Sequence, residues 1–262
     1  MLRRLLVNNF MENQISIVDT EQEVSLETNK EDMMSLFVKS VFGIIPFGSP
    51  IGEAITTVIP NQKLERVVDF VHILNYKIKN AERKIEEQEL KSTEFTDLLE
   101  DALGQASRAL SKERLEYIAS LLKNSLTEEE LEHTEKKKLL ALLNELNDAE
   151  IIWLKNYSHR VRSFGSLEYK EFYENHRKIL EPVRVRIGSG TEQVNKNALQ
   201  KSYKENLLNL GLIEEDFKSV KKGELPELDE KTGKMKANGF SGNALGRLLL
   251  KYIDEGQTEN TN

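Results

Sequence analysis

The clearest pattern of hydrophobic and polar positions in the chain begins after Asn61. Apolar residues recur there in alternating steps of three and four, and charged residues fill the positions between them. This spacing is a heptad seam and predicts one long helix. The seam would pack against a second copy of the chain or against another helix of the same chain. It consists of Leu64, Val67, Val71, Leu74, Ile78, Ala81 and Ile85.

Further apolar stripes at helical spacing predict a series of helices between residues 95 and 182. The stripes are Phe95, Leu98, Leu99, Ala102, Leu103 and Ala106; Leu115, Ile118, Ala119 and Leu122; and Leu139, Leu140, Leu142, Leu143 and Leu146. Polar residues that favour N-cap positions set the boundaries. The expected caps are Ser111, Thr127 in a capping box with Glu130, Asn147 or Asp148, and Ser166, whose helix Pro182 ends.

The most hydrophobic stretch is residues 33–60, which Pro46, Gly48, Ser49 and Pro50 interrupt. It predicts two short apolar helices around a tight turn. Each arm is far shorter than the roughly 20 apolar residues of a spanning helix. The hairpin is therefore buried in the fold or meets a membrane surface or a partner. Its candidate contact residues are Phe42, Ile44, Ile45, Phe47, Ile51 and Ile55.

The last third of the chain has a different pattern of apolar, basic and turn-forming residues. Residues 183–190 alternate apolar and basic side chains, as in a short strand or an extended linker. An amphipathic helix over 191–210 stops at Gly211. A polar hairpin over 212–240 and an apolar helix follow. Helix, hairpin and helix around a Leu-Gly-Leu turn predict a winged-helix-like module.

The fold class predicted is mainly α: a multi-helix bundle with a long heptad-bearing helix and a C-terminal winged-helix-like α/β module. The expected order is a flexible leader at 1–32, the apolar hairpin at 33–60 and the helical bundle at 61–182. The winged-helix-like module at 183–255 and a disordered tail at 256–262 complete it.

Composition agrees with long solvated helices. Charged residues make up 31% of the chain, and only five prolines and fourteen glycines occur. The absence of cysteine excludes disulfides and thiolate chemistry. The N-terminus lacks the apolar core of a signal peptide. We therefore expect a cytoplasmic protein, with peripheral or inducible association at the inner membrane as the alternative.

No arrangement of residues indicates catalysis. The four histidines, His72, His133, His159 and His176, show no metal-binding spacing, and no nucleophile or phosphate-loop motif occurs. Gly188 and Gly190 precede a helix, which fits a phosphate site or a turn that Thr191 caps. We expect no enzyme activity, no cofactor, no metal and no small-molecule substrate.

The distribution of charge along the chain is relevant to an alternative function, the binding of nucleic acid. The chain carries a net −7, whereas residues 183–255 hold thirteen Lys and Arg against eleven Asp and Glu, a net of +2. Phosphate contact needs a positive surface, so the acidic residues of this region count against it. A DNA-associated regulator stays as the alternative function, with Lys196, Lys201 and Lys204 as the possible contacts.

Four segments carry a resemblance to a known family. They are FTDLLEDALGQASRAL at 95–110, KKLLALLNELNDAEIIWL at 137–154, LLNLGLIEE at 207–215 and ALGRLLLKYI at 244–253. In these segments the chain resembles the abortive-infection alpha family of bacterial phage-defence proteins. The resemblance implies a non-catalytic defence protein that acts through a membrane or a protein partner, and it supplies no active-site residues. Self-association along the seam would then present several hairpins together.

Overall fold

The computed structural model describes residues 61–254, apart from 129, 164, 221–222, 224 and 231–232. The leader, the apolar hairpin and the tail lie outside the described residues. So do the six hairpin positions Phe42, Ile44, Ile45, Phe47, Ile51 and Ile55.

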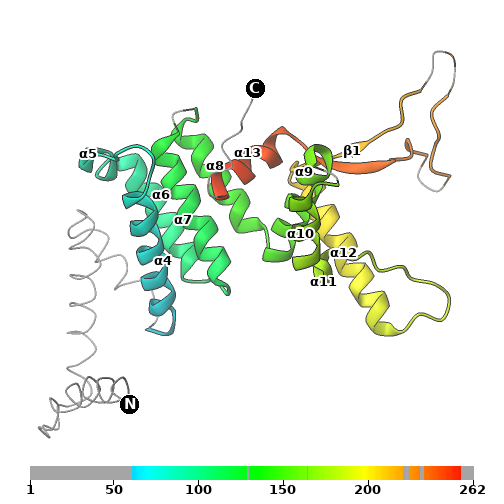
Figure 1. The fold of residues 1–262 in the computed structure, drawn as a ribbon, viewed down its shortest axis with the longest axis horizontal. Coiled ribbons are helices and arrows are strands. Elements are labelled where there is room, and N and C mark those ends of the chain that lie inside the picture. The colour runs from blue at the N-terminus through cyan, green and yellow to red at the C-terminus, as the bar shows by residue number, and fades with distance from the viewer. Residues whose placement is uncertain are drawn as a thin grey trace, which may run out of the picture.

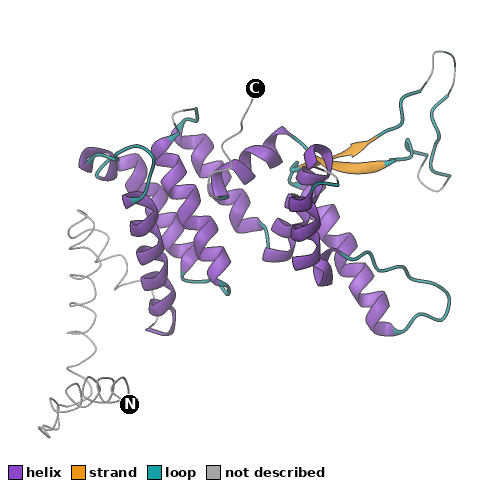
Figure 2. Ribbon diagram, viewed as in Figure 1, coloured by secondary structure: helices purple, strands orange, loops and turns teal. Residues whose placement is uncertain are grey.

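The described chain is mainly helical, as predicted, with ten helices and one two-stranded sheet among residues 61–254 (Figures 1 and 2). The helices are α4 (Asn61–Lys79), α5 (Glu87–Leu90), α6 (Thr93–Ala106), α7 (Lys112–Thr127), α8 (His133–Glu145), α9 (Asp148–Ser163), α10 (Leu167–Asn175), α11 (Arg177–Leu180), α12 (Thr191–Asn209) and α13 (Ala244–Ile253). The strands are β1 (Ile213–Asp216) and β2 (Gly239–Gly242).

The heptad seam faces the chain's own bundle. Val67, Val71 and Leu74 are at most 4% exposed, and α4 lies along α7 (Figure 1). Ile78 is half-buried against the same core. Of the two partners that the pattern allowed, these side chains contact a helix of the same chain. A second copy would reach them only if the bundle opened.

The long helix is shorter than its seam. It ends at Lys79, so Ala81 and Ile85 follow the helix and do not extend the heptads, contrary to the prediction. The Asn80 side chain donates a hydrogen bond to the carbonyl oxygen of Tyr76, at 2.8 Å. Asparagine bonds of this kind compete with the continuing helical ladder and favour an end.

Several predicted helix starts are confirmed. Ser111 and Ser166 cap α7 and α10 by accepting backbone N–H bonds at 3.1 Å. Before α9, Asn147 and Glu150 exchange side-chain and backbone hydrogen bonds at 2.8 and 2.9 Å. Each cap satisfies N–H groups that the first helical turn leaves without an intrahelical partner.

Two predicted boundaries are wrong. Thr127 is the last residue of α7 and does not start a helix; α8 starts at His133, and its capping box is Glu132 with Glu135. Glu128 and Glu130 instead bind the ammonium of Lys251 at 2.9 and 3.0 Å. That long-range contact has no trace in the local sequence.

The other wrong boundary is a single helix running from Ser166 to Pro182. It divides at His176 into α10 and α11. The ring Nδ1 of His176 lies 2.9 Å from the Phe172 carbonyl oxygen. The imidazole thus shares an acceptor with the helical ladder, and the backbone of His176 leaves the helical conformation.

The C-terminal unit is built on α9. Helices α10, α11 and α12 and strand β2 all pack against it. The strands pair antiparallel, from Ile213 opposite Gly242 to Asp216 opposite Gly239. The last helix, α13, returns to pack on α7, and Leu207, Leu249 and Tyr252 belong to the same core as the bundle. The bundle and the C-terminal unit therefore share one hydrophobic core.

Two glycines permit close contacts within the C-terminal unit. A Cβ at Gly246 would overlap the carbonyl of Leu212 and come within 3.0 Å of Leu154 Cδ1. A Cβ at Gly242 would overlap the hydroxyl of Ser158. Only glycine allows α13 and β2 to approach these backbones so closely.

Candidate interaction surface of the C-terminal unit

Helix α12 is fixed at its C-terminal end and projects from the body over the rest of its length (Figure 1). Its only fully buried side chain is Leu207. Asn206 Nδ2 donates to Glu150 Oε1 of α9 at 3.0 Å. Gly211, at φ +68°, ends the helix in the left-handed conformation, as the sequence predicted. The first three turns of α12 consequently offer their outer face to solvent.

Side chains of α12 bind the first residues of the segment 181–190. Gln200 donates to the carbonyls of Ile179 and Glu181 at 3.1 and 2.8 Å and accepts the Val183 N–H at 3.1 Å. Asn197 donates to the Val183 carbonyl at 2.6 Å. The segment is a loop, not the strand that its alternation allowed.

The segment's side chains point outward. Arg184 and Arg186 are exposed, and so are Val185 and Ile187 between and beyond them. A turn follows at Gly188, whose φ is +92°, and Gly190 is the N-cap of α12 without a side-chain cap bond. Thr191 is therefore inside the helix and does not cap it, contrary to one of the two predicted alternatives.

A second projection, which we call the arm, is the excursion 217–238 between β1 and β2 (Figure 2). Near its tip Leu228 pairs with Met235, and Gly233 turns with φ +68°. Asp229 and Lys236 donate backbone bonds to Lys234 and Glu227, both at 2.8 Å. The predicted hairpin is present, and it stands away from the core.

The arm carries a high share of exposed apolar side chains. Twelve large hydrophobic residues are exposed in the described part of the chain, and five of them lie on the arm. An exposed apolar group of this kind marks an interaction surface more often than a lone exposed leucine does. The five are Phe217, Val220, Leu225, Leu228 and Met235.

The three lysines predicted to contact nucleic acid do not form one cluster. Lys196 and Lys201 are exposed, but five residues along a helix separate them by roughly 140° around its axis. Lys204 is half-buried, with its Nζ 4.4 Å from the centre of the Phe240 ring. Arg184 and Arg186, in the segment predicted to be a short strand or an extended linker, were not predicted as contacts.

The polar networks of the bundle connect helix ends. Arg114 of α7 donates to Asp148 at 3.0 Å, to the Leu143 carbonyl at 2.8 Å and to the Leu146 carbonyl. Arg114 thereby binds carbonyl groups at the end of α8 and a carboxylate at the start of α9. Ser111 adds a bond to Asp148 at 2.6 Å.

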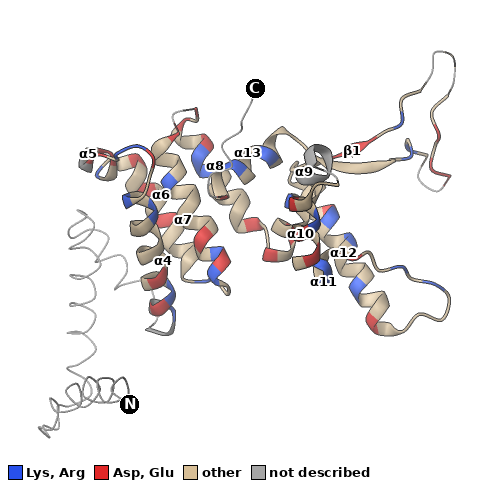
Figure 3. Cartoon of the chain, in the orientation of Figure 1, with Lys and Arg blue, Asp and Glu red and all other residues tan. Residues whose placement is uncertain are grey.

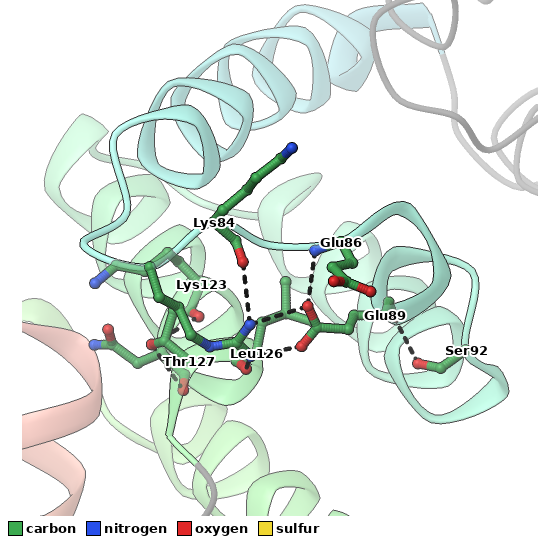
Figure 4. A network of polar contacts seen from close by, with 9 residues as sticks. Lys84, Glu86, Glu89, Ser92, Lys123, Leu126 and Thr127 are labelled. Carbon is green, nitrogen blue, oxygen red and sulfur yellow. Dashed lines mark hydrogen bonds and ion pairs between the residues drawn. The ribbon is translucent and has the colours of Figure 1, made fainter.

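A second network joins the end of α7 to α5 (Figure 4). Arg83 donates to both carboxylate oxygens of Glu89 and to the carbonyl of Leu126. Glu89 also accepts the N–H of Glu86 at 2.7 Å. The Arg83 bond lowers the pKa of Glu89 below its usual value. These contacts fix the loop after α4. The charged groups that make them are bound to one another and are not available for a reaction.

A pocket of about 300 Å³ lies beside this network, between α6 and the start of α8. His133 lines it, with Nε2 2.8 Å from Asp97, which also binds Lys137 at 2.7 Å. Hydrogen bonds from Lys137 and then His133 lower the pKa of Asp97. Among the described residues no group of acidic and histidine side chains could hold a metal ion. The Asp97 contacts thus join α6 to α8.

The C-terminal helix is held by buried polar contacts. Asn124 of α7 donates to the Tyr252 carbonyl at 2.9 Å. Lys155 of α9 binds Asp254 at 2.5 Å, and its Nζ lies 4.8 Å from the centre of the Tyr117 ring. Burial raises the pKa of Tyr252 to about 12. These bonds attach α13 to the bundle and leave the arm and α12 as the projecting parts.

The fold and surface define a mainly helical protein with a projecting C-terminal unit. No protein-family model matches the chain, and neither a curated protein nor a solved structure matches it. Within residues 61–254, none of the described helices is long and apolar enough to cross a bilayer.

Proposed function

We propose that this protein acts by binding protein through its arm, without catalysis, and that the partner is a second copy of the chain. The observation that carries the proposal is the concentration of exposed apolar residues on the arm, including Phe217, Leu228 and Met235. Aromatic residues and methionine are enriched at the centres of protein interfaces. Burying them against a partner would remove apolar surface from water.

Charge complementarity supports a second copy as that partner. The arm holds six lysines against four carboxylates, a net of +2. At its base, β1 exposes Glu214, Glu215 and Asp216, a net of −3. An arm that crosses to the β1 of another copy would bring its lysines to these carboxylates. A two-fold contact would repeat the match in the other direction.

Pairing of the two β1 edges is a less favourable geometry for the dimer. Antiparallel pairing of β1 with its copy would place acidic residues opposite acidic residues. Like charges directly opposite each other destabilise a strand pair. Charged edge strands also resist such pairing in natural proteins. The arm, and not the strand edge, is therefore the proposed contact.

The projecting unit is winged-helix-like in this proposal. Its order of helix α12, strand β1, arm, strand β2 and helix α13 supports that description, as does the Leu210–Gly211–Leu212 turn. The arm takes the place of the wing, and α12 precedes it. Winged units that present a wing to a protein partner need no catalytic residues.

The deciding measurement is the molar mass of the intact chain by light scattering over a concentration series. We expect a dimer that Phe217→Asp with Leu228→Asp converts to a monomer. The matched control is Leu110→Asp with Leu167→Asp, which changes two apolar residues outside the arm that are even more exposed, at 90% and 83% against 45% and 57% for Phe217 and Leu228. A monomer at every concentration, or a dimer that both pairs weaken equally, would contradict the proposal.

The resemblance to abortive-infection proteins supports a role in phage defence, which we propose as the biological setting. Cells that express the intact chain should lower the plating efficiency of a susceptible phage. The arm variant should lose this effect, and the Leu110 and Leu167 control should keep it. If a monomeric arm variant still gave full protection, phage defence would not depend on contact through the arm.

A further inference from the structure

A strongly basic edge runs from α11 through the loop into α12. Residues 177–204 contain seven Lys and Arg against two Glu, a net of +5. Since the whole chain carries −7, the remaining residues carry −12. Figure 3 shows the basic positions along α12 and the preceding loop. The flanking residues Glu174 and Glu205 mark the limits of the edge. The cations are Arg177, Lys178, Arg184, Arg186, Lys196, Lys201 and Lys204.

The edge is exposed and partly preorganised. Arg184, Arg186, Lys196 and Lys201 are all exposed. The bonds from Gln200 and Asn197 described above fix the backbone up to Val183, next to Arg184, and the Arg186 N–H donates to Ser189 Oγ at 2.9 Å within the loop. A cationic surface that is already ordered loses less conformational entropy on binding than one that must first fold. Charge of this density, on an acidic protein, points to a polyanion as the ligand.

The composition of α12 distinguishes among polyanions. Its exposed N-terminal half presents Gln193, Asn195 and Lys196, whose side chains can donate to base edges in a major groove. The helix is polar on nearly all sides, so it lacks the wide apolar face with which interfacial helices enter a lipid surface. At 19 residues it is roughly 28 Å long and projects freely, which suits a groove.

We propose that this edge binds double-stranded DNA, with Arg184, Arg186 and Lys201 on phosphates and the exposed half of α12 facing a groove. The B-form major groove admits an α-helix, whereas that of an RNA duplex is too narrow for side chains to read. Lys204 is held by Phe240 and is a minor contributor. The DNA edge uses residues apart from the arm, so this proposal goes beyond the proposed function and does not depend on it.

The test is fluorescence anisotropy of the intact chain with a mixed-sequence duplex of about 20 base pairs, which spans roughly two helical turns. Titrations at salt concentrations from about 50 to about 200 mM give the salt dependence. With the three proposed phosphate contacts, the logarithm of the affinity should fall with a slope of roughly −2.7 against the logarithm of the salt concentration.

The decisive variant is Arg184→Ala with Arg186→Ala. It should weaken binding at least about tenfold and make the slope less steep by roughly 1.8. The matched control, Lys112→Ala with Lys138→Ala, removes the same charge from exposed bundle positions and should leave the slope unchanged. Thermal unfolding of both variants at the temperature of the parent chain would show that neither change acts through folding.

Several outcomes would overturn the proposal. These are no binding at the lowest salt, or equal weakening by the edge variant and its control. Tighter binding of an RNA duplex or single strand than of the DNA duplex would also overturn it. So would competition by poly-glutamate as effective as that by unlabelled DNA, or preferential capture by anionic vesicles. Duplex-selective, salt-steep binding that the edge variant loses would support it.

Discussion

The backbone N–H of Val183 donates to Oε1 of Gln200 at 3.1 Å, and this bond joins the loop before α12 to the helix itself. The same side chain bonds the carbonyls of Ile179 and Glu181 through Nε2. One glutamine of α12 therefore binds the end of α11 and the first residues of the loop that follows it. Together with Asn197 it fixes the backbone up to Val183, next to Arg184.

Replacing Gln200 with alanine should release this segment while leaving the core folded. We expect faster hydrogen exchange at the Val183 amide and a loss of stability of about 1 kcal/mol, the usual size for such hydrogen bonds. DNA affinity should fall, but less than on removal of the arginines, because the charges remain. Exchange measured by mass spectrometry tests this. Gln193→Ala, which removes an exposed amide from the same helix, should change neither the exchange rate of the Val183 amide nor the stability.

The junction of α13 with the rest of the fold should be sensitive at Gly246. In Gly246→Ala the new methyl group would meet the backbone of Leu212, which cannot give way as a flexible side chain can. We expect a loss of about 2–3 kcal/mol, typical of overpacking. Chemical denaturation measures it.

Gly104→Ala is the matched control for that change. Gly104 lies in the last turn of α6, is exposed and has no heavy atom within 4 Å of the added Cβ. A glycine inside a helix costs about 0.5–1 kcal/mol relative to alanine, so this variant should gain stability. If the two alanines had the same effect, the close approach at Gly246 would not be what limits that position.

Loss of the Arg114 side chain should strongly destabilise the bundle. Arg114→Ala removes bonds to the Leu143 and Leu146 carbonyls and leaves Asp148 without its cation. We expect a decrease of about 2–4 kcal/mol in the free energy of unfolding, since charge-assisted bonds are worth about 1.5–3 kcal/mol each and do not add fully. Arg108→Ala, at an exposed position of the α6–α7 loop, should stay within about 0.5 kcal/mol of the parent.

The link between α6 and α8 should depend on pH through Asp97. Its pKa is lowered in the folded protein by Lys137 and His133, so its contribution is present above the usual carboxyl pKa of about 4. That contribution is lost as the pH falls through the lowered folded value. Asp97→Asn should therefore be less stable than the parent at neutral pH and equally stable in strong acid.

Urea unfolding at neutral pH and at about pH 2 measures this difference. Glu100→Gln removes an exposed carboxylate from the same helix and serves as the control. A stability difference between Asp97→Asn and the parent that is the same at both pH values would show that the ionised carboxylate of Asp97 is not the stabilising group.

Local sequence signals predicted most of the helices correctly. Apolar stripes such as Phe95, Leu98 and Ala102 are buried, because a helix places residues three and four apart on one face. Ser111 and Ser166 cap the helices expected of them, since a hydroxyl supplies an acceptor where the ladder has none. The end of α12 at Gly211 is also confirmed. Its cause is local as well, because glycine is free to adopt positive φ.

Predictions failed both where a distant residue binds a local group and where a side chain bonds a carbonyl four residues earlier and a helix ends, as at Asn80 and His176. Thr127 and Glu130 resembled a capping box, but Lys251, more than a hundred residues away, binds the neighbouring carboxylates. The heptad pattern specified that Val67, Val71 and Leu74 would be buried, yet it could not name the helix that buries them. A heptad pattern identifies the buried side chains of one helix but carries no information about the helix that packs against them.

The sequence by itself determined the mainly helical class, the positions of most helix ends and the hairpin between β1 and β2, because these follow from spacing and backbone chemistry within a few residues. The tertiary structure alone decided that α7 covers the seam, that α13 packs on α7, and that Gly246 approaches the backbone of Leu212 closely. Those relations depend on which distant surfaces meet, and packing free energy summed over the whole core selects them.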